Sequence, residues 1–343
     1  MLLRYLRPPH EYLRRHMPQM QRLLSAGALA ALLGAWMRHN PAYPPYWDIA
    51  LTLSVALSGL WSPLAAFWLA GLGSLYGVYH ISFYLAVLWL CVLILAQRAA
   101  SRHLGATALL LAAPFLARWR LLWVAPLFGG LYLGTAGGAW MGVFAAAWSE
   151  TLAALHGFAP DFLQLAGHPW SISVLQARFA GLNSWRTLGA LATPLAPNPT
   201  ALLYHLLQIA LWGLAGALVG RWMQENPRGG HPSGVLLTTL KGALLLEIAQ
   251  GGLSLWLGQH PAGWFASQGL PLLLNMLFAP LALTWLEVLR DFFQRPLPLP
   301  PPTTRPAPEN PAPQRIVLPD SLPQSENLEK NDDESDLIML ELD

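Results

Sequence analysis

The sequence predicts an all-α fold, namely a polytopic bundle of transmembrane helices. Of its 343 residues, 54% are hydrophobic and only 11% are charged, whereas soluble domains carry about 25% charged residues. The chain also contains 16 tryptophans and has a mean hydropathy of +0.39. A soluble protein of this length needs a largely charged surface, so the composition excludes a soluble enzyme and a nucleic-acid-binding domain.

Charge divides the chain into two unlike regions. Residues 1–295 hold 17 basic and 8 acidic side chains, while residues 296–343 hold 3 basic and 10 acidic ones. The net charge of +2 is therefore a cancellation between a basic membrane region and an acidic tail. The single cysteine, Cys91, excludes a disulfide within the chain and a thiolate metal site, and we interpret it as a small packing residue.

The membrane region begins after a basic segment, residues 1–22, which we expect to stay in the cytoplasm. Residues 49–97 carry no formal charge and, at about 20 residues per crossing, provide two long spans or three short ones. Residues 104–117 are short for a full crossing. The other predicted spans lie near 20–37, 121–148, 200–220, 234–258 and 264–288.

Orientation follows from the basic residues, because Lys and Arg are retained on the cytoplasmic side. With about eight spans (seven to nine), most of the arginine clusters become cytoplasmic and so do both termini. If 49–97 forms three spans, Arg98 and Arg102 lie inside and residues 104–117 are re-entrant. The predicted location is a bacterial-type plasma (inner) membrane, so the lipid bilayer is the first expected partner.

Residues 150–199 form a long connection that is predicted to be extracytoplasmic. The segment is apolar for a loop and contains Trp170, Trp185, Arg178 and Arg186. Tryptophan is enriched at the level of the lipid headgroups. We therefore expect a helix over roughly 171–191 that lies in the interface, and the connection either caps the bundle or forms an extracytoplasmic lid.

The tail after residue 295 has the composition of a disordered segment. Residues 296–323 include 11 prolines, and the remainder is polar and acidic, so it cannot bury enough apolar surface to fold alone. An apolar run set among acids at the terminus is typical of a short motif that docks on a cytoplasmic protein. The residues of this predicted motif are Leu337, Ile338, Met339, Leu340 and Leu342.

Glycines repeat at intervals of four in three predicted spans. On a helix, this spacing gives a smooth stripe that lets a second backbone approach closely, from the same chain or from a partner membrane protein. The alternative is that the glycines leave room for a ligand along a substrate path. The residues are Gly130, Gly134, Gly138 and Gly142, then Gly73 and Gly77, then Gly216 and Gly220.

Two of these glycine-spaced segments follow a Pro-Leu pair, Pro63-Leu64 and Pro126-Leu127. In this respect residues 49–150 resemble the membrane substrate-capture components of bacterial energy-coupling-factor transporters, and they are similar to five-helix membrane sensor domains. The resemblance implies capture of a small molecule within a helical bundle. It identifies no binding residue.

Polar side chains within spans are candidate functional residues because they are costly at membrane depth. Glu247 is the acid predicted in mid-span, and Gln250 and Ser254 share its helix face. His205 and Gln208 share a face of the preceding span, and Asn275 lies midway along the last one. We expect Glu247, Gln250, His205, Gln208 and Asn275 to converge on a polar site, with interhelical hydrogen bonding as the structural alternative.

Known catalytic and cofactor motifs are absent from the sequence. It contains no His-Glu-x-x-His, no G-x-S-x-G and no Gly-rich loop ending in Gly-Lys-Ser/Thr, and no pair of Cys or His has metal-ligand spacing. We therefore expect no enzyme, cofactor, metal or nucleic-acid partner. The leading hypothesis is a sensor or scaffold that recruits a cytoplasmic partner through its tail. The alternative is a small-molecule transporter, or its substrate-binding subunit, with a site around Glu247.

Overall fold

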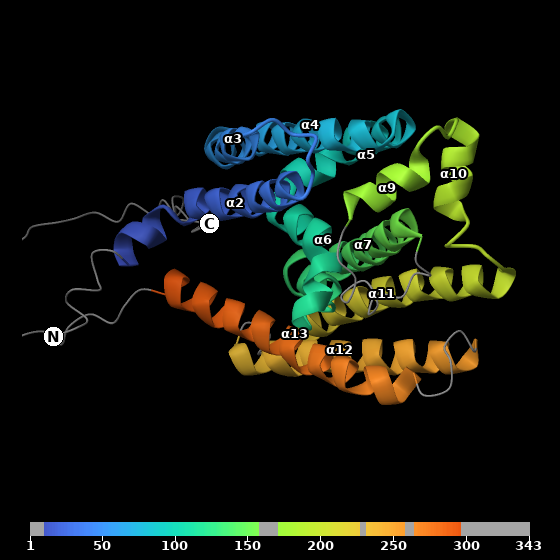
Figure 1. Cartoon of the computed structure of the whole chain (residues 1–343). Helices are drawn as coiled ribbons and strands as arrows, with labels where there is room; N and C mark the ends of the chain where they lie inside the picture. The colour runs from blue at the N-terminus through green and yellow to red at the C-terminus, as the bar shows by residue number, and fades with distance from the viewer. Residues whose placement is uncertain (1–9, 158–170, 227–230, 258–263, 296–343) are drawn as a thin grey trace, which may run out of the picture. The chain divides into compact units, whose positions relative to one another are not determined.

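The computed structural model describes residues 10–157, 171–226, 231–257 and 264–295, with only the backbone of 264–268 (Figure 1). Every regular element in these residues is a helix, which confirms the all-α prediction for this part of the chain. The predicted tail, with its docking residues Leu337, Ile338, Met339, Leu340 and Leu342, lies outside the described residues.

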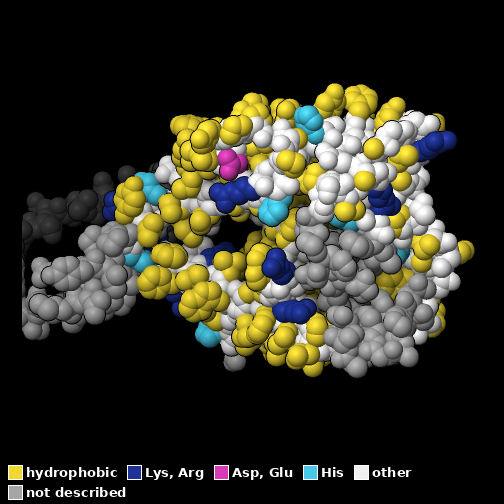
Figure 2. Space-filling model, in the orientation of Figure 1, with side chains coloured by type: hydrophobic (Ala, Val, Ile, Leu, Met, Phe, Trp, Pro, Cys, Tyr) yellow, Lys and Arg dark blue, Asp and Glu magenta, His cyan; other side chains and the backbone are white. Residues whose placement is uncertain are grey.

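Five described helices are long and apolar enough to cross a membrane. Hydrophobic side chains cover much of the face drawn in Figure 2, where charged ones are few. The membrane prediction is therefore supported by length and composition. The five helices are α4 (Pro63–Ile81), α5 (Phe83–Arg102), α11 (Pro199–Glu225), α12 (Pro232–Trp256) and residues 269–294 of α13 (Trp264–Gln294).

The charge-free stretch 49–97 forms parts of three successive helices, of which the second and third are long enough to cross a membrane. These are α3 (Trp47–Trp61), α4 and α5. Ser62 separates the first pair: its side chain accepts a hydrogen bond from the Ala65 amide while Pro63 occupies the first position of α4. With α2 (Met17–Arg38), these helices share a core of small and branched side chains that includes Ala26, Val55, Ala66 and Leu93.

α6 (Leu104–Leu116) joins the two halves of the helical region (Figure 1). Its first half packs in the α2–α5 core through Leu104 and Ala108. Its end, with the short η1 (Ala117–Trp119), packs in a second core with α7 (Val124–His156), α11, α12 and α13. At 13 residues, about 20 Å long, α6 is too short to cross a bilayer and connects the two cores instead.

α7 is a hairpin of two helical arms, so the prediction of one continuous tilted span over 121–148 is wrong. Gly134 has φ +71° and ψ −169°, which glycine adopts readily and other residues do not. A Cβ placed on Gly129 would lie 3.2 Å from Cα of Gly138. In a straight helix residues nine apart are separated by about 13 Å, so the arms 124–133 and 135–156 lie against each other.

The same geometry corrects the predicted stripe of four glycines. Gly130 lies on the first arm, Gly138 and Gly142 lie on the second, and Gly134 is the bend between them. They are not four successive turns of one helix. The sequence spacing was read as helical because nothing in it distinguishes a glycine that packs from a glycine that breaks the helix.

The connection after α7 contains two short helices in place of the single predicted one. α9 (Ile172–Phe179) packs against the ends of α4 and α5 through Ile172, Leu175 and Phe179. α10 (Ser184–Ala192) begins at Asn183, whose side chain accepts a hydrogen bond from the Arg186 amide. Arg178 of α9 donates to the carbonyls of Ala154 (2.8 Å) and Leu155 (3.2 Å) at the end of α7 and to that of Ala190 in α10.

The last three helices complete the second core. Asn198 caps α11 by accepting from the Ala201 amide at 2.7 Å, and His231 caps α12. Leu246 of α12 and Leu283 of α13 are buried in this core beside Val219 of α11. α13 contains Pro271 and Pro280, on either side of the buried Asn275.

Candidate functional site

α11 lies against both arms of the α7 hairpin at backbone distance. A Cβ on Gly130 of the first arm would lie 2.6 Å from the carbonyl oxygen of Gly216. A Cβ on Gly138 of the second arm would collide with the same carbonyl, and one on Gly220 would lie 2.6 Å from the carbonyl carbon of Gly134. The glycines of both helices therefore permit an approach that any side chain would prevent.

The contacts along this seam run antiparallel. Gly220 lies opposite Gly134 and Gly216 opposite Gly138, while a Cβ on Gly142 would collide with the backbone of Trp212. Rising numbers on α11 thus match falling numbers on the second arm. The seam continues past the glycines to a buried polar pair, Glu150 of α7 and His205 of α11.

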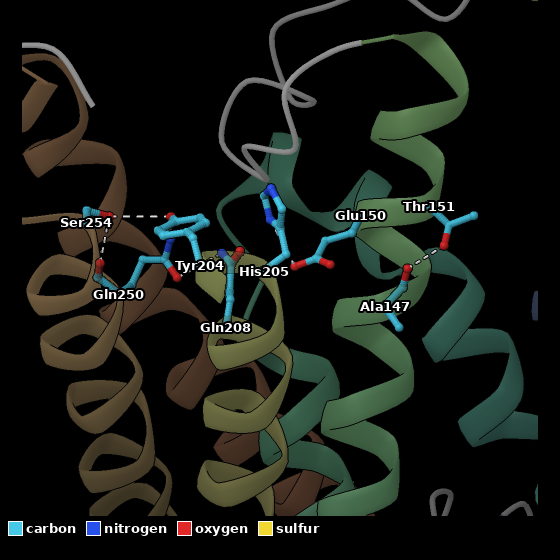
Figure 3. A network of polar contacts seen from close by, with 8 residues as sticks. All are labelled: Ala147, Glu150, Thr151, Tyr204, His205, Gln208, Gln250 and Ser254. Carbon is cyan, nitrogen blue, oxygen red and sulfur yellow. Dashed lines mark hydrogen bonds and ion pairs between the residues drawn. The ribbon is translucent and has the colours of Figure 1, made fainter. Parts of the chain in front are cut away.

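Glu150 and His205 lie side by side as a buried pair, which is an ion pair only when the imidazole is protonated. Oε1 of Glu150 lies 3.6 Å from Nδ1 of His205, and the two residues are 3% and 6% exposed. Neither atom has a hydrogen-bond partner within 3.5 Å. An uncompensated charge in this environment is expensive, so each group constrains the other. Figure 3 shows the Glu150 carboxylate pointing from α7 toward His205.

Next to His205, the helices α11 and α12 are joined by a chain of buried hydrogen bonds (Figure 3). Nε2 of Gln208 donates to Oε1 of Gln250 at 3.0 Å, and Nε2 of Gln250 donates to the Tyr204 hydroxyl at 2.8 Å. The Tyr204 and Ser254 hydroxyls are 3.4 Å apart. We call Glu150, Tyr204, His205, Gln208, Gln250 and Ser254 the polar cluster.

The structure therefore brings three of the predicted residues into one place. Gln208 and Gln250 bond directly, and His205 lies one turn from Gln208 on the same face of α11. Glu247 precedes Gln250 by one turn of α12. It is half-buried, and its Oε2 atom is buried without a hydrogen-bond partner.

Asn275 lies elsewhere, where α6 leads into α7. Its Oδ1 accepts a hydrogen bond from the Leu122 amide at 3.3 Å, and the side chain is fully buried. The adjacent Trp123 stacks on Trp212, with ring centroids 6.2 Å apart. Asn275 thus satisfies a backbone amide ahead of the first arm of α7. The expected convergence of all five residues does not extend to it.

Glu150 is the residue that the sequence reasoning missed. The predicted span 121–148 ends before Glu150 because Glu150 is charged, and residues 150–199 are predicted to form the outer connection. In the structure α7 continues to His156, and Ser149, Glu150, Ala153 and Ala154 are all buried. The available signal was the small-residue pattern around Glu150, which extends the helix past it.

The predicted glycines of α4 have a packing environment of their own. A Cβ on Gly73 would lie 3.2 Å from Cδ2 of Leu33 in α2, and one on Gly77 would lie 2.7 Å from the Tyr43 hydroxyl. That hydroxyl donates to the carbonyl of Gly73 and accepts from the amide of Gly77. These glycines therefore serve the α2–α4 contact and lie outside the polar cluster.

Comparison with known proteins gives no relative for this chain: no family model, no curated protein and no solved structure matches it. Within the described residues, no group of three or more His, Cys, Asp or Glu is placed to hold a metal ion. The functional argument therefore depends on the polar cluster itself.

Proposed function

We propose that this chain is a multi-pass membrane protein that binds and moves a small solute, either as a transporter or as the substrate-binding subunit of one. The observation that carries the proposal is the polar cluster. Five of its six residues belong to α11 and α12, two helices able to span a membrane, and all six are buried. Buried ionisable groups in membrane-spanning helices typically mark substrate or ion pathways.

The packing of the second arm of α7 on α11 is consistent with the same proposal, because it brings Glu150 beside His205. Gly134 interrupts α7, and its second arm carries Glu150 into the polar cluster. The resemblance of residues 49–150 to substrate-capture components agrees with this proposal.

The proposed topology has eight crossings with both termini in the cytoplasm of a plasma-membrane protein. The crossings are α2, α3, α4, α5, the arm 135–156, α11, α12 and α13, while α6 and the arm 124–133 do not cross the bilayer. One contact supports the even number: Nε2 of His10 donates to the carbonyl of Phe292 at 2.8 Å, so the start of the bundle and the end of α13 are adjacent.

A second proposal concerns the acidic tail, which we expect to be disordered and to recruit a cytoplasmic protein. It is favoured by the sequence Leu337-Ile338-Met339-Leu340 set among acids. Deleting residues 332–343 should remove a co-purified cytoplasmic protein and leave the bundle folded. An unchanged set of co-purified proteins would refute it.

Solute uptake into proteoliposomes tests the transport proposal. The full chain should accumulate at least one member of a panel of labelled amines, carboxylates and neutral sugars with saturable kinetics. Glu150→Gln and Gln208→Leu should lower uptake of that solute by tenfold or more. The first removes the buried negative charge and the second removes a buried acceptor, and a hydrogen bond to a charged partner is worth about 1.5–3 kcal/mol.

The matched control for uptake is Ser54→Ala. Ser54 is exposed, and its hydroxyl donates to the Ala50 carbonyl of its own helix, so uptake should be unchanged. If no solute is accumulated, or if the two cluster variants transport as well as the wild-type protein, the proposal is wrong.

A further inference from the structure

The polar cluster has unused hydrogen-bonding capacity of one kind. Its buried side-chain atoms without a partner are Oε1 of Glu150, Oε1 of Gln208 and Nδ1 of His205. The first two are oxygen acceptors. The third is an acceptor whenever the imidazole carries its single proton on the other nitrogen. Leaving buried polar atoms unpaired costs about 1–3 kcal/mol each, so they are expected to have a function.

The direction of the hydrogen-bond chain shows that Gln208 presents an oxygen. The Ser254 hydroxyl donates its proton to the backbone carbonyl of Gln250 at 2.8 Å. The Tyr204 oxygen accepts from Nε2 of Gln250 and lies 3.4 Å from the Ser254 hydroxyl. Oε1 of Gln250 is then the acceptor for Nε2 of Gln208. Since Nε2 of Gln208 donates to Gln250, the other atom of the amide, Oε1 of Gln208, is left at the end of the chain without a partner.

Charge adds a second constraint on the ligand. The cluster contains one carboxylate, that of Glu150, and none of its six residues is Lys or Arg. His205 is the group paired with this carboxylate, at 3.6 Å, which is beyond good hydrogen-bonding distance. An anion would meet a buried carboxylate and two further acceptors without a cationic side chain in the cluster to offset them. A cation that donates hydrogen bonds complements all three unpaired atoms.

We propose that the polar cluster binds a primary ammonium group, so that the solute is a small organic amine in its protonated form. Glu150 supplies the counter-charge, and Oε1 of Gln208 accepts one N–H. Neutral His205 accepts another through Nδ1. The Gln250–Tyr204–Ser254 chain positions Gln208 and holds its amide in the orientation that presents the oxygen. This inference rests on the proposed function and specifies the solute class of the same site.

Titration calorimetry with the purified full-length protein in detergent tests the proposal. The probes are methylammonium chloride, tetramethylammonium chloride and sodium acetate, each against sodium chloride. Methylammonium should bind saturably. Tetramethylammonium has the same charge and no N–H donor, so its affinity should be lower by tenfold or more. Acetate should give no heat of binding.

Variants assign the binding to the cluster. Glu150→Gln and Gln208→Leu should each lower methylammonium affinity by tenfold or more, and Ser54→Ala should leave it unchanged. Elution of each variant at the wild-type volume in gel filtration shows that it is folded. Gln250→Leu tests the positioning of Gln208 and should also lower the affinity for methylammonium. Because the Gln208 amide is then free to turn, the ratio of the methylammonium affinity to the tetramethylammonium affinity should decrease.

Two results overturn the proposal in distinguishable ways. If acetate binds, or if tetramethylammonium binds as tightly as methylammonium, and this binding is lost in the Glu150 and Gln208 variants, the proposed solute class is wrong but the location of the site is correct. Absence of binding by methylammonium also refutes the amine class. In that case, uptake of another solute of the panel in proteoliposomes retains the proposed function, and absence of all uptake removes the function as well.

Discussion

The carbonyl oxygen of Gly216 lies 2.6 Å from the position that a Cβ on Gly130 would occupy, and a Cβ on Gly138 would collide with the same oxygen. One residue of α11 is thus in contact with both arms of the α7 hairpin. Neither contact can widen without moving backbone. The position of His205 relative to Glu150, farther along the same seam, depends on this close approach.

Gly130→Ala should therefore destabilise the bundle, although alanine is the better helix former. The added methyl would meet a backbone oxygen, and overpacking of this kind costs about 1–3 kcal/mol. Gly252→Ala is the matched control, because a Cβ there meets nothing within 4 Å. It should be neutral or stabilise by up to about 1 kcal/mol. Tryptophan-monitored thermal unfolding in micelles measures both, and equal midpoints would contradict the seam.

Gly134→Ala should be destabilising for a different reason. Its φ of +71° with ψ of −169° belongs to a region that is essentially restricted to glycine, at a cost of about 1–3 kcal/mol for other residues. Gly252→Ala again serves as the helical control. A Gly134→Ala protein with a wild-type midpoint would show that α7 runs straight.

Asn275→Leu should destabilise the junction ahead of α7 by about 1–3 kcal/mol, because it leaves the buried Leu122 amide without its acceptor. The control is Thr284→Val on the same helix, whose hydroxyl donates to the Pro280 carbonyl within α13. Thermal unfolding compares the two. If Thr284→Val costs as much as Asn275→Leu, the interhelical bond has no special importance.

Arg178→Gln should release the segment of α9 and α10 from the end of α7. The guanidinium donates to the carbonyls of Ala154 and Leu155 at the end of α7 and to that of Ala190 in α10, so it joins the three helices. Hydrogen exchange over residues 171–196 should accelerate in this variant. Arg186→Gln alters an exposed arginine on α10 and should leave the exchange unchanged; similar rates in both variants would argue against the clamp.

The helical class could be predicted from the sequence, because long stretches without formal charge, such as 49–97, are typical of membrane-spanning helices. The sequence also indicated Gln208 and Gln250, since polar residues at helical spacing share a face. It did not indicate the bend at Gly134, because a glycine that packs and a glycine that breaks a helix occur in the same pattern. Glu150 was missed for a related reason: a single acid was taken as the end of a span, although its neighbours are small and apolar.

Asn275 illustrates a third limit. Its position midway along an apolar helix suggested a place in a common polar site, but its partner is a backbone amide 153 residues away. The sequence does not show which backbone amides between η1 and α7 lack a partner within a helix. Only the packing of α13 against this junction shows which side chain satisfies them.

Water access to the polar cluster tests the central claim most directly. In a Cys91→Ser background, Gln208→Cys should react with a membrane-impermeant methanethiosulfonate in proteoliposomes, because a solute site must open to water. Ser233→Cys, at the exposed start of α12, is the reactive control, and Ala243→Cys, in the core, is the unreactive one. Modification of Gln208→Cys at a rate between these two controls is the predicted result. A rate equal to that of Ala243→Cys would mean that the cluster only holds helices together and would contradict the account.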